Sequence, residues 1–89
     1  MKRLYATFNT CKIDLNRQCD IVCNDGMTRK VTTFKVDCWS KSGKSVDVIF
    51  YNGNIAITTL RKKVIYKNEN MYIKVNGNEY NIGEYYEEV

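Results

Sequence analysis

The sequence contains no histidine and no proline, and each absence narrows what the chain can be. Without histidine, a Ser-His-Asp triad and a histidine-based metal or acid–base site are both excluded. The carboxylates form no pair typical of a general acid and base, because they lie at polar strand positions or crowd the tail. Without proline, every residue keeps the N–H that pairs strands, which suits regular β structure. We expect a protein that is not an enzyme and holds no cofactor.

Long apolar runs are missing as well. Behind the basic start, the apolar stretch Leu4-Tyr5-Ala6 ends at Thr7, short of the roughly 7–15 residues of a signal-peptide core. Nothing approaches the roughly 20 apolar residues that a membrane-spanning helix needs. The sequence therefore predicts a cytoplasmic protein with no membrane partner.

Cysteine is too sparse for a disulfide scaffold, because four in 89 residues fall below the roughly 8–10% of such proteins. The spacing C-x7-C-x3-C-x14-C lacks the two matched knuckles of a structural zinc site. We therefore expect no metal site and free, buried thiols that pack as small hydrophobes: Cys11, Cys19, Cys23 and Cys38.

One short segment, Ser42-Gly43-Lys44-Ser45, has the residues that end a phosphate-binding P-loop. The first glycine of that motif would fall at Cys38, and a strand rather than a helix is expected after Ser45. The segment is therefore interpreted as a polar hairpin loop.

What is present is the composition of an ordinary globular domain, with 44% apolar residues and a net charge of +4. Residues 1–89 are expected to form one small domain. Two Asn-Gly pairs, Asn52-Gly53 and Asn76-Gly77, each lie between strand-like runs and predict tight hairpins. Two-residue turns at these pairs would place Phe50 opposite Ile55, and likewise Ile73 opposite Tyr80 and Met71 opposite Ile82.

Alternating apolar residues predict further strands over residues 4–8 and 32–39. Residues 11–23 are ambiguous. Their odd positions favour a hairpin through residues 16–18, which would bring Cys11 opposite Cys23, whereas the spacing of Cys11, Leu15 and Cys19 also fits a short helix near residues 10–19. The predicted fold class is all-β, with about seven or eight short antiparallel strands in a closed barrel or a small sandwich.

Charge is unevenly distributed, at +5 over residues 1–45 and −1 over residues 46–89. Strand parity places Arg29, Lys35 and Trp39 on the side opposite Phe34, where they would face solvent. An exposed tryptophan among cations can bind single-stranded nucleic acid by stacking and phosphate contact. A second basic group completes this surface: Arg61, Lys62, Lys63 and Lys67.

The tail is acidic and aromatic, and its Tyr85 and Tyr86 suit a protein partner better than a phosphate backbone. Asparagine, lysine, isoleucine and tyrosine are abundant, a bias common in AT-rich genomes. In this respect the chain is similar in kind to the short inhibitor proteins of phages and mobile elements, of which anti-CRISPR proteins are one class.

That resemblance implies a protein-binding inhibitor that occupies the surface of a host protein. Its candidate contacts are the Trp39 face and the two tail tyrosines. The alternative is a small β-barrel that binds single-stranded nucleic acid through the same Trp39 face. A monomer and a homodimer paired through an edge strand are both compatible with the sequence.

Overall fold

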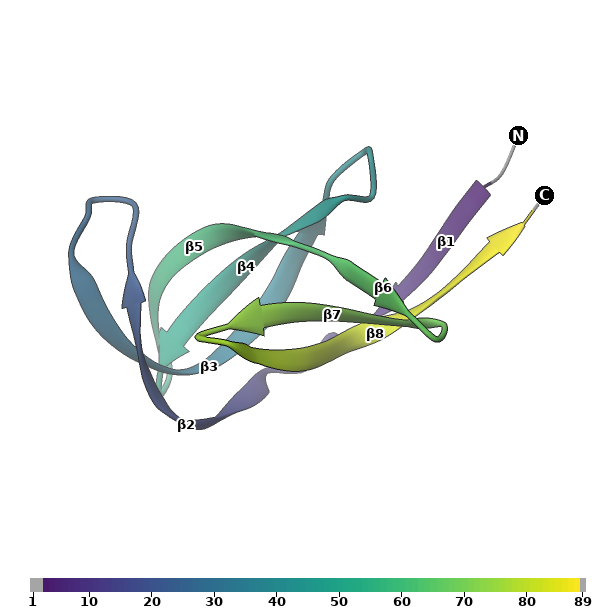
Figure 1. The fold of residues 1–89 in the computed structure, drawn as a ribbon. Helices are drawn as coiled ribbons and strands as arrows, with labels where there is room; N and C mark the ends of the chain where they lie inside the picture. Colours follow the sequence, from purple (N-terminus) through teal and green to yellow (C-terminus); the bar gives the residue numbers. More distant parts are fainter. Residues whose placement is uncertain (1–2, 89) are drawn as a thin grey trace.

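Eight antiparallel strands make up the computed structural model, which describes residues 3–88 (Figure 1). They form two four-stranded sheets, with strand orders β1-β8-β7-β6 and β2-β3-β4-β5. The strands are β1 (Arg3–Phe8), β2 (Ile13–Val22), β3 (Thr28–Trp39), β4 (Ser45–Asn52), β5 (Ile55–Lys63), β6 (Ile65–Lys67), β7 (Asn70–Val75) and β8 (Asn78–Glu88). The prediction of a small all-β fold is confirmed.

The chain passes between the two sheets at two places. Residues 9–12 lead from β1 to β2, and Val64 alone separates β5 from β6, where its N–H donates to the Lys44 carbonyl over 2.9 Å. Over residues 3–88 no strand ladder joins one sheet to the other, so the sheets do not close into a barrel. The barrel alternative is therefore wrong for this range.

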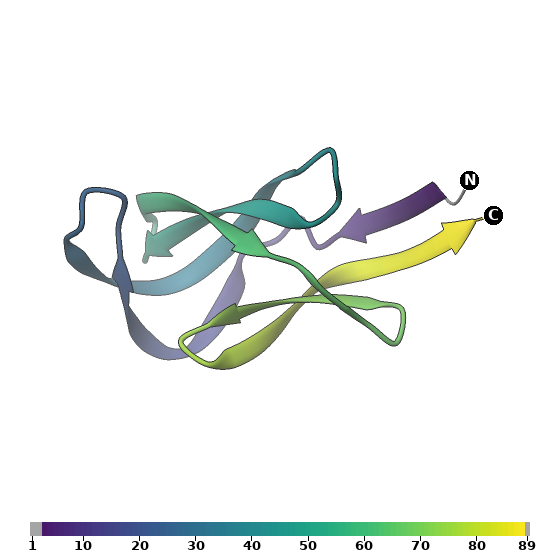
Figure 2. The ribbon, with the colours of Figure 1, turned by 45° about the horizontal axis from the view of Figure 1, so that its top comes forward.

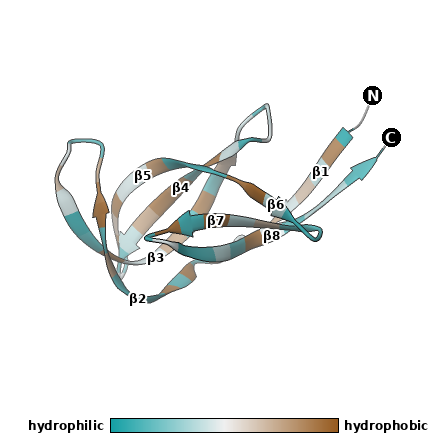
Figure 3. Ribbon diagram, viewed as in Figure 1, coloured by the Kyte–Doolittle hydropathy of each residue, from teal (hydrophilic) through white to brown (hydrophobic). Residues whose placement is uncertain are grey.

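The core lies between the two sheets. β3 and β4 contribute the fully buried Phe34 and Phe50, and β7 and β8 contribute Ile73 and Ile82. Phe34 meets Tyr80 of the other sheet edge-on, with ring centroids 5.6 Å apart. Alternating hydrophobic and hydrophilic positions along the strands provide these inward-facing side chains (Figure 3). The sequence pattern of period two is thus the cause of the two-layer core.

The four cysteines differ in burial. All four are free thiols, but only Cys19 and Cys23 are buried, while Cys11 and Cys38 are exposed. The expectation of free thiols is confirmed, and the expectation that all four pack in the core is wrong.

The hairpin at Asn76-Gly77 forms as predicted. Both turn residues have positive φ, 49° and 85°, as a type I′ turn requires, and Ile73 pairs with Tyr80. The ladder shifts by one residue beyond Tyr72, so Met71 lies opposite Gly83 and not Ile82. The predicted register therefore holds next to the turn only.

The hairpin between β4 and β5 forms one residue away from its predicted place. Asn52 pairs with Ile55, so the turn residues are Gly53 and Asn54 and not Asn52 and Gly53. Only Gly53 has positive φ (60°), which is the pattern of a type II′ turn. A further register shift between Tyr51 and Phe50 places Phe50 opposite Thr58, so its predicted pairing with Ile55 is wrong.

Residues 13–22 form one continuous strand, so both the predicted hairpin through residues 16–18 and the predicted helix near residues 10–19 are wrong. The period of two is real, because Leu15, Cys19 and Ile21 are buried. An irregularity between Asp14 and Cys19 absorbs the polar residues 16–18 without reversing the chain. The reversal comes at residues 23–27, where Gly26 has a φ of 83°.

β8 is a long central strand that changes partners along its length. Its first half pairs with β7 and its second half with β1, and Gly83 lies opposite both Met71 and Phe8. A Cβ atom at Gly83 would lie 2.2 Å from the Thr7 carbonyl oxygen and 3.0 Å from Met71 Cε, and its φ is 155°. Only glycine permits this approach of three strands.

Beyond this crossing, β1 and the second half of β8 project from the body as a two-stranded ribbon (Figures 1 and 2). We call residues 3–7 and 84–88 the β1–β8 ribbon. It accounts for the elongated shape of the molecule, which measures 43 × 24 × 22 Å.

Gly83→Ala is expected to lower the free energy of unfolding by about 3 kcal/mol, because the added methyl group must displace the Thr7 backbone. Urea denaturation measures this loss. Gly77→Asn is the control, since that turn has open space and asparagine tolerates its positive φ. Equal stability of Gly83→Ala and the wild type would contradict the close packing at the crossing.

Candidate functional site

The predicted row of Arg29, Lys35 and Trp39 does not share one face of β3. Arg29 pairs with Ile21, which is buried, so it lies on the core-facing side at the end of the sheet. Lys35 pairs with Ile49 on the outer face. Strand β3 changes phase between them, because Val31 and Phe34, three residues apart, are both fully buried. The predicted surface is therefore split.

The Trp39 side chain faces the core because of a second irregularity in β3. The β3–β4 ladder shifts between Val36 and Cys38, which turns Trp39 to the core side and Cys38 to solvent. The half-buried indole packs edge-on against Phe8 at 5.7 Å and donates from Nε1 to Tyr66 Oη over 3.2 Å. Tyr66 in turn donates to the Gly43 carbonyl. This arrangement closes one end of the core and offers no open stacking platform.

Trp39→Ala is therefore expected to destabilise the fold by about 2 kcal/mol, because it removes a half-buried ring from the end of the core. Denaturant unfolding followed by far-ultraviolet circular dichroism measures the change. An Asn54→Ala variant at an exposed turn serves as the control. A Trp39→Ala protein as stable as the control would show that the indole has no structural role.

The Tyr66 hydroxyl makes stability sensitive to alkali. Burial raises the pKa of Tyr66, although the hydrogen bond from Trp39 acts in the opposite direction. Because the pKa is higher in the folded state, the protonated hydroxyl stabilises the fold. This contribution to stability is complete below the unfolded-state pKa of about 10 and is lost as the pH rises through the folded-state pKa. Between pH 8 and pH 12, the thermal unfolding temperature should therefore fall more steeply for the wild type than for Tyr66→Phe. Parallel pH curves would contradict this assignment.

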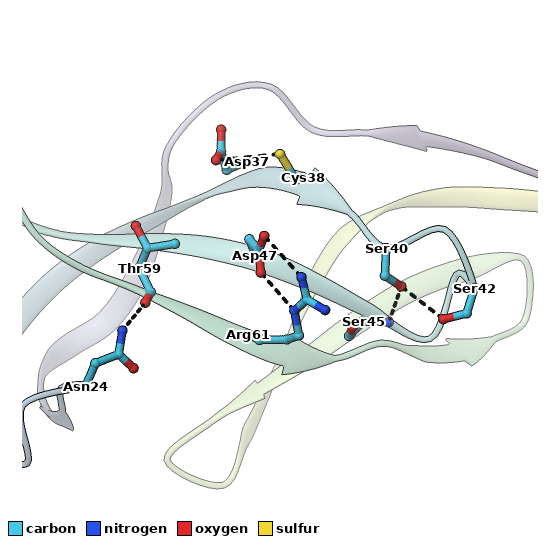
Figure 4. Close-up of polar contacts among 9 residues, drawn as sticks. All are labelled: Asn24, Asp37, Cys38, Ser40, Ser42, Ser45, Asp47, Thr59 and Arg61. Carbon is cyan, nitrogen blue, oxygen red and sulfur yellow. Dashed lines mark hydrogen bonds and ion pairs between the residues drawn. The ribbon is translucent and has the colours of Figure 1, made fainter.

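Three of the predicted cations have acidic partners: Arg29, Arg61 and Lys67. Arg61 contacts Asp47 through two hydrogen bonds of 3.0 and 3.4 Å (Figure 4), and Lys67 contacts Glu79 at 2.8 Å. The Asp47 hydrogen bond raises the pKa of Arg61, and the Lys67 hydrogen bond lowers the pKa of Glu79. Arg29 is paired with Asp25 at 3.0 Å. These ion pairs leave less positive charge for phosphate than the sequence suggests.

The basic run on β5 also alternates between faces. Arg61 and Lys63 lie opposite Asp47 and Ser45 on the outer side, whereas Lys62 lies opposite the buried Val46. The run therefore does not form one continuous track of cations.

The structure offers little for covalent or metal chemistry. Within residues 3–88, no three cysteine, aspartate or glutamate side chains are grouped so as to hold a metal ion. The exposed Cys38 thiol lies 3.7 Å from the Asp37 carboxylate, whose charge raises its pKa and disfavours the reactive thiolate. In the same part of the chain, no helix has the length and apolarity to cross a membrane.

The tail tyrosines point in opposite directions. Tyr85 lies on the core side and meets Tyr66 edge-on at 4.7 Å. Tyr86 lies on the outer face of the β1–β8 ribbon, is 58% exposed, and stacks on Tyr5 of β1. Their ring centroids are 4.9 Å apart and the planes differ by 14°. Tyr5 was missed from the sequence, although the alternation of residues 4–8 already placed it opposite Leu4 and Ala6.

A shallow depression of about 390 Å³ lies beside the tyrosine pair. Its wall is the turn between β6 and β7, where Asn68 and Glu69 both have positive φ, and the Tyr85 N–H donates to the Glu69 carbonyl over 3.0 Å. The lining residues are Thr7, Asn68, Glu69, Asn70, Glu84, Tyr85 and Tyr86. We call the outer face of the β1–β8 ribbon, with this depression, the ribbon face.

Comparison with known proteins gave no match to a family model, to a curated protein or to a solved structure. The chemistry of the surface is therefore what indicates a function.

Proposed function

We propose that this protein is a non-enzymatic protein-binding module that acts as an inhibitor by occupying a partner's surface with the ribbon face. The observation that carries the proposal is the exposed Tyr86, stacked on the half-buried Tyr5, on a projecting ribbon. Tyrosine is enriched in interface cores because it presents a large apolar surface with a polar end.

The stacking lowers the entropic cost of binding. Immobilising a free side chain at an interface costs roughly 0.5–1.5 kcal/mol. Tyr5 and Tyr86 already restrict each other in the unbound protein, since their rings lie 4.9 Å apart and nearly parallel. A partner would therefore meet a preorganised surface.

Charge indicates the chemistry of the partner. The whole chain carries +4, yet the described residues on the outer face of the β1–β8 ribbon include two carboxylates, Glu84 and Glu88, and one cation, Arg3. Glu69 adds a further carboxylate at the depression. A basic protein surface complements this end of the molecule, and complementary charge favours the correct encounter. A surface that normally holds nucleic acid has this character.

Direct binding of single-stranded nucleic acid has weaker support from the geometry. Its proposed stacking residue, Trp39, is half-buried and packs against Phe8 and Tyr66. On the outer face of the other sheet, the Tyr51 ring is covered by Lys12, whose Nζ lies 4.1 Å from the ring centroid. Both aromatic groups therefore have an intramolecular partner already.

The test is differential capture from a bacterial lysate on the immobilised protein, quantified by mass spectrometry. The Tyr5→Ser, Tyr86→Ser double variant should reduce at least one captured protein by about tenfold or more, because it removes the central aromatic contact. Tyr51→Ser is the matched control, since it changes a tyrosine on the opposite sheet.

Capture that is the same for the wild type and the ribbon variant would overturn the proposal. Anisotropy of labelled single-stranded DNA and RNA at low and near-physiological salt completes the test. Tight binding that falls steeply with salt and depends on Lys35 would support the nucleic-acid alternative in place of the proposal.

A further inference from the structure

The four edge strands of the two sheets differ in how they are protected against pairing with another chain. An edge strand presents unsatisfied N–H and C=O groups, and proteins protect it with short length, charge, proline or a bulge. β6 has only three residues, β2 carries an irregularity between Asp14 and Cys19, and β5 carries the basic run at residues 61–63. Each of these three edges therefore has at least one such device.

β1 has only one of them, the charge of Arg3 at its first residue. It is six residues long, and its register with β8 is continuous from Arg3–Glu88 to Phe8–Gly83. Residues 4–8 contain no charge and no proline. The strand also lies on the projecting ribbon, away from the body of the molecule (Figure 2). Among residues 3–88, β1 is the edge best suited to accept another strand.

The hydrogen-bond pattern identifies which backbone groups are available. The Asn9 N–H donates to the Ile82 carbonyl over 2.9 Å, and these residues continue the β1–β8 register. Hydrogen-bonded pairs alternate along an antiparallel ladder, so residues 7, 5 and 3 also direct their backbone groups toward β8. Leu4, Ala6 and Phe8 therefore direct their N–H and C=O groups toward the open edge.

We propose that β1 binds an extended, basic segment of the partner protein as a fifth strand of its sheet, through the backbone groups of Leu4, Ala6 and Phe8. This inference rests on the proposed function and specifies how the ribbon face is used. Main-chain hydrogen bonds along the edge supply affinity, and alternate side chains of the added strand supply specificity.

Charge favours a basic segment over a second copy of this chain. A second copy added through its own β1 would bring one cation, Arg3, to the Tyr5 side of the edge, whereas a basic segment brings a cation at every second residue. A lysine or arginine on the added strand, on the side of Tyr5 and Thr7, lies about two strand spacings (~10 Å) from Glu84. A long basic side chain spans much of that distance and approaches the depression.

The test uses a fluorescein-labelled peptide of about eight residues in which arginine alternates with valine, with glutamate in place of arginine as the acidic control. The wild type should bind the basic peptide and not the acidic one. Ala6→Pro should weaken binding about tenfold or more, because proline removes one edge N–H and its ring obstructs the added strand. Ala6→Ser keeps the N–H and should bind like the wild type.

A second measurement is independent of the proline variant. In the wild type, the amide protons of Leu4, Ala6 and Phe8 should exchange rapidly by NMR, and the basic peptide should slow all three. Unchanged exchange at these amides, or equal binding by Ala6→Pro and Ala6→Ser, would overturn strand addition. Peptide-induced dimerisation, or self-association of the free protein through β1, would identify a second copy as the occupant and likewise overturn it.

The two proposals fail separately. Loss of lysate capture in the tyrosine variant together with full capture by Ala6→Pro would leave the ribbon face as the binding surface and refute strand addition. Capture that is insensitive to both variants would refute both proposals.

Discussion

The approach of three strands at Gly83 is the constraint on which the rest of the structure depends. The Thr7 carbonyl occupies the space that any Cβ at this position would need, so β8 can pass between β1 and β7 only with glycine there. The first half of β8 therefore contributes Tyr80 and Ile82 to the core, and its second half pairs with β1 in the projecting ribbon. The pairing of β1 with the second half of β8, and with it the projecting ribbon, depends on that contact.

The same geometry separates two kinds of surface. Around the body, half of the six arginines and lysines predicted to bind phosphate are paired with carboxylates, as Arg61 is with Asp47. On the outer face of the ribbon, Glu84 and Glu88 outnumber Arg3 among the described residues, and Tyr86 is exposed where it stacks on Tyr5. Exposed ion pairs contribute little to stability, but they lower the charge available to a ligand. A chain with a net charge of +4 can therefore present an acidic, aromatic end to a basic partner.

The sequence predicted those features that depend on local chemistry. Positive φ at Asn76 and Gly77 follows from the residues themselves, and the alternation of apolar residues located most strands. The sequence did not predict the shifts of strand register, because a strand accommodates one extra residue wherever tertiary packing favours it. The shift between Val36 and Cys38 moves Trp39 from the expected outer face onto Phe8 and Tyr66. For this reason the predicted Trp39 surface does not form. The Tyr5–Tyr86 pair results from the pairing of β1 with β8, which no local sequence pattern specifies.

The central claim, that the ribbon face is the binding surface, is tested most directly by site-specific photo-crosslinking in bacterial cells. A photoreactive phenylalanine analogue replaces Tyr86 in one protein and Tyr51 in another, two tyrosines on opposite sheets. If the ribbon face binds the partner, position 86 yields a discrete protein adduct and position 51 yields none. An adduct only from position 51, or none from either position, would contradict that claim.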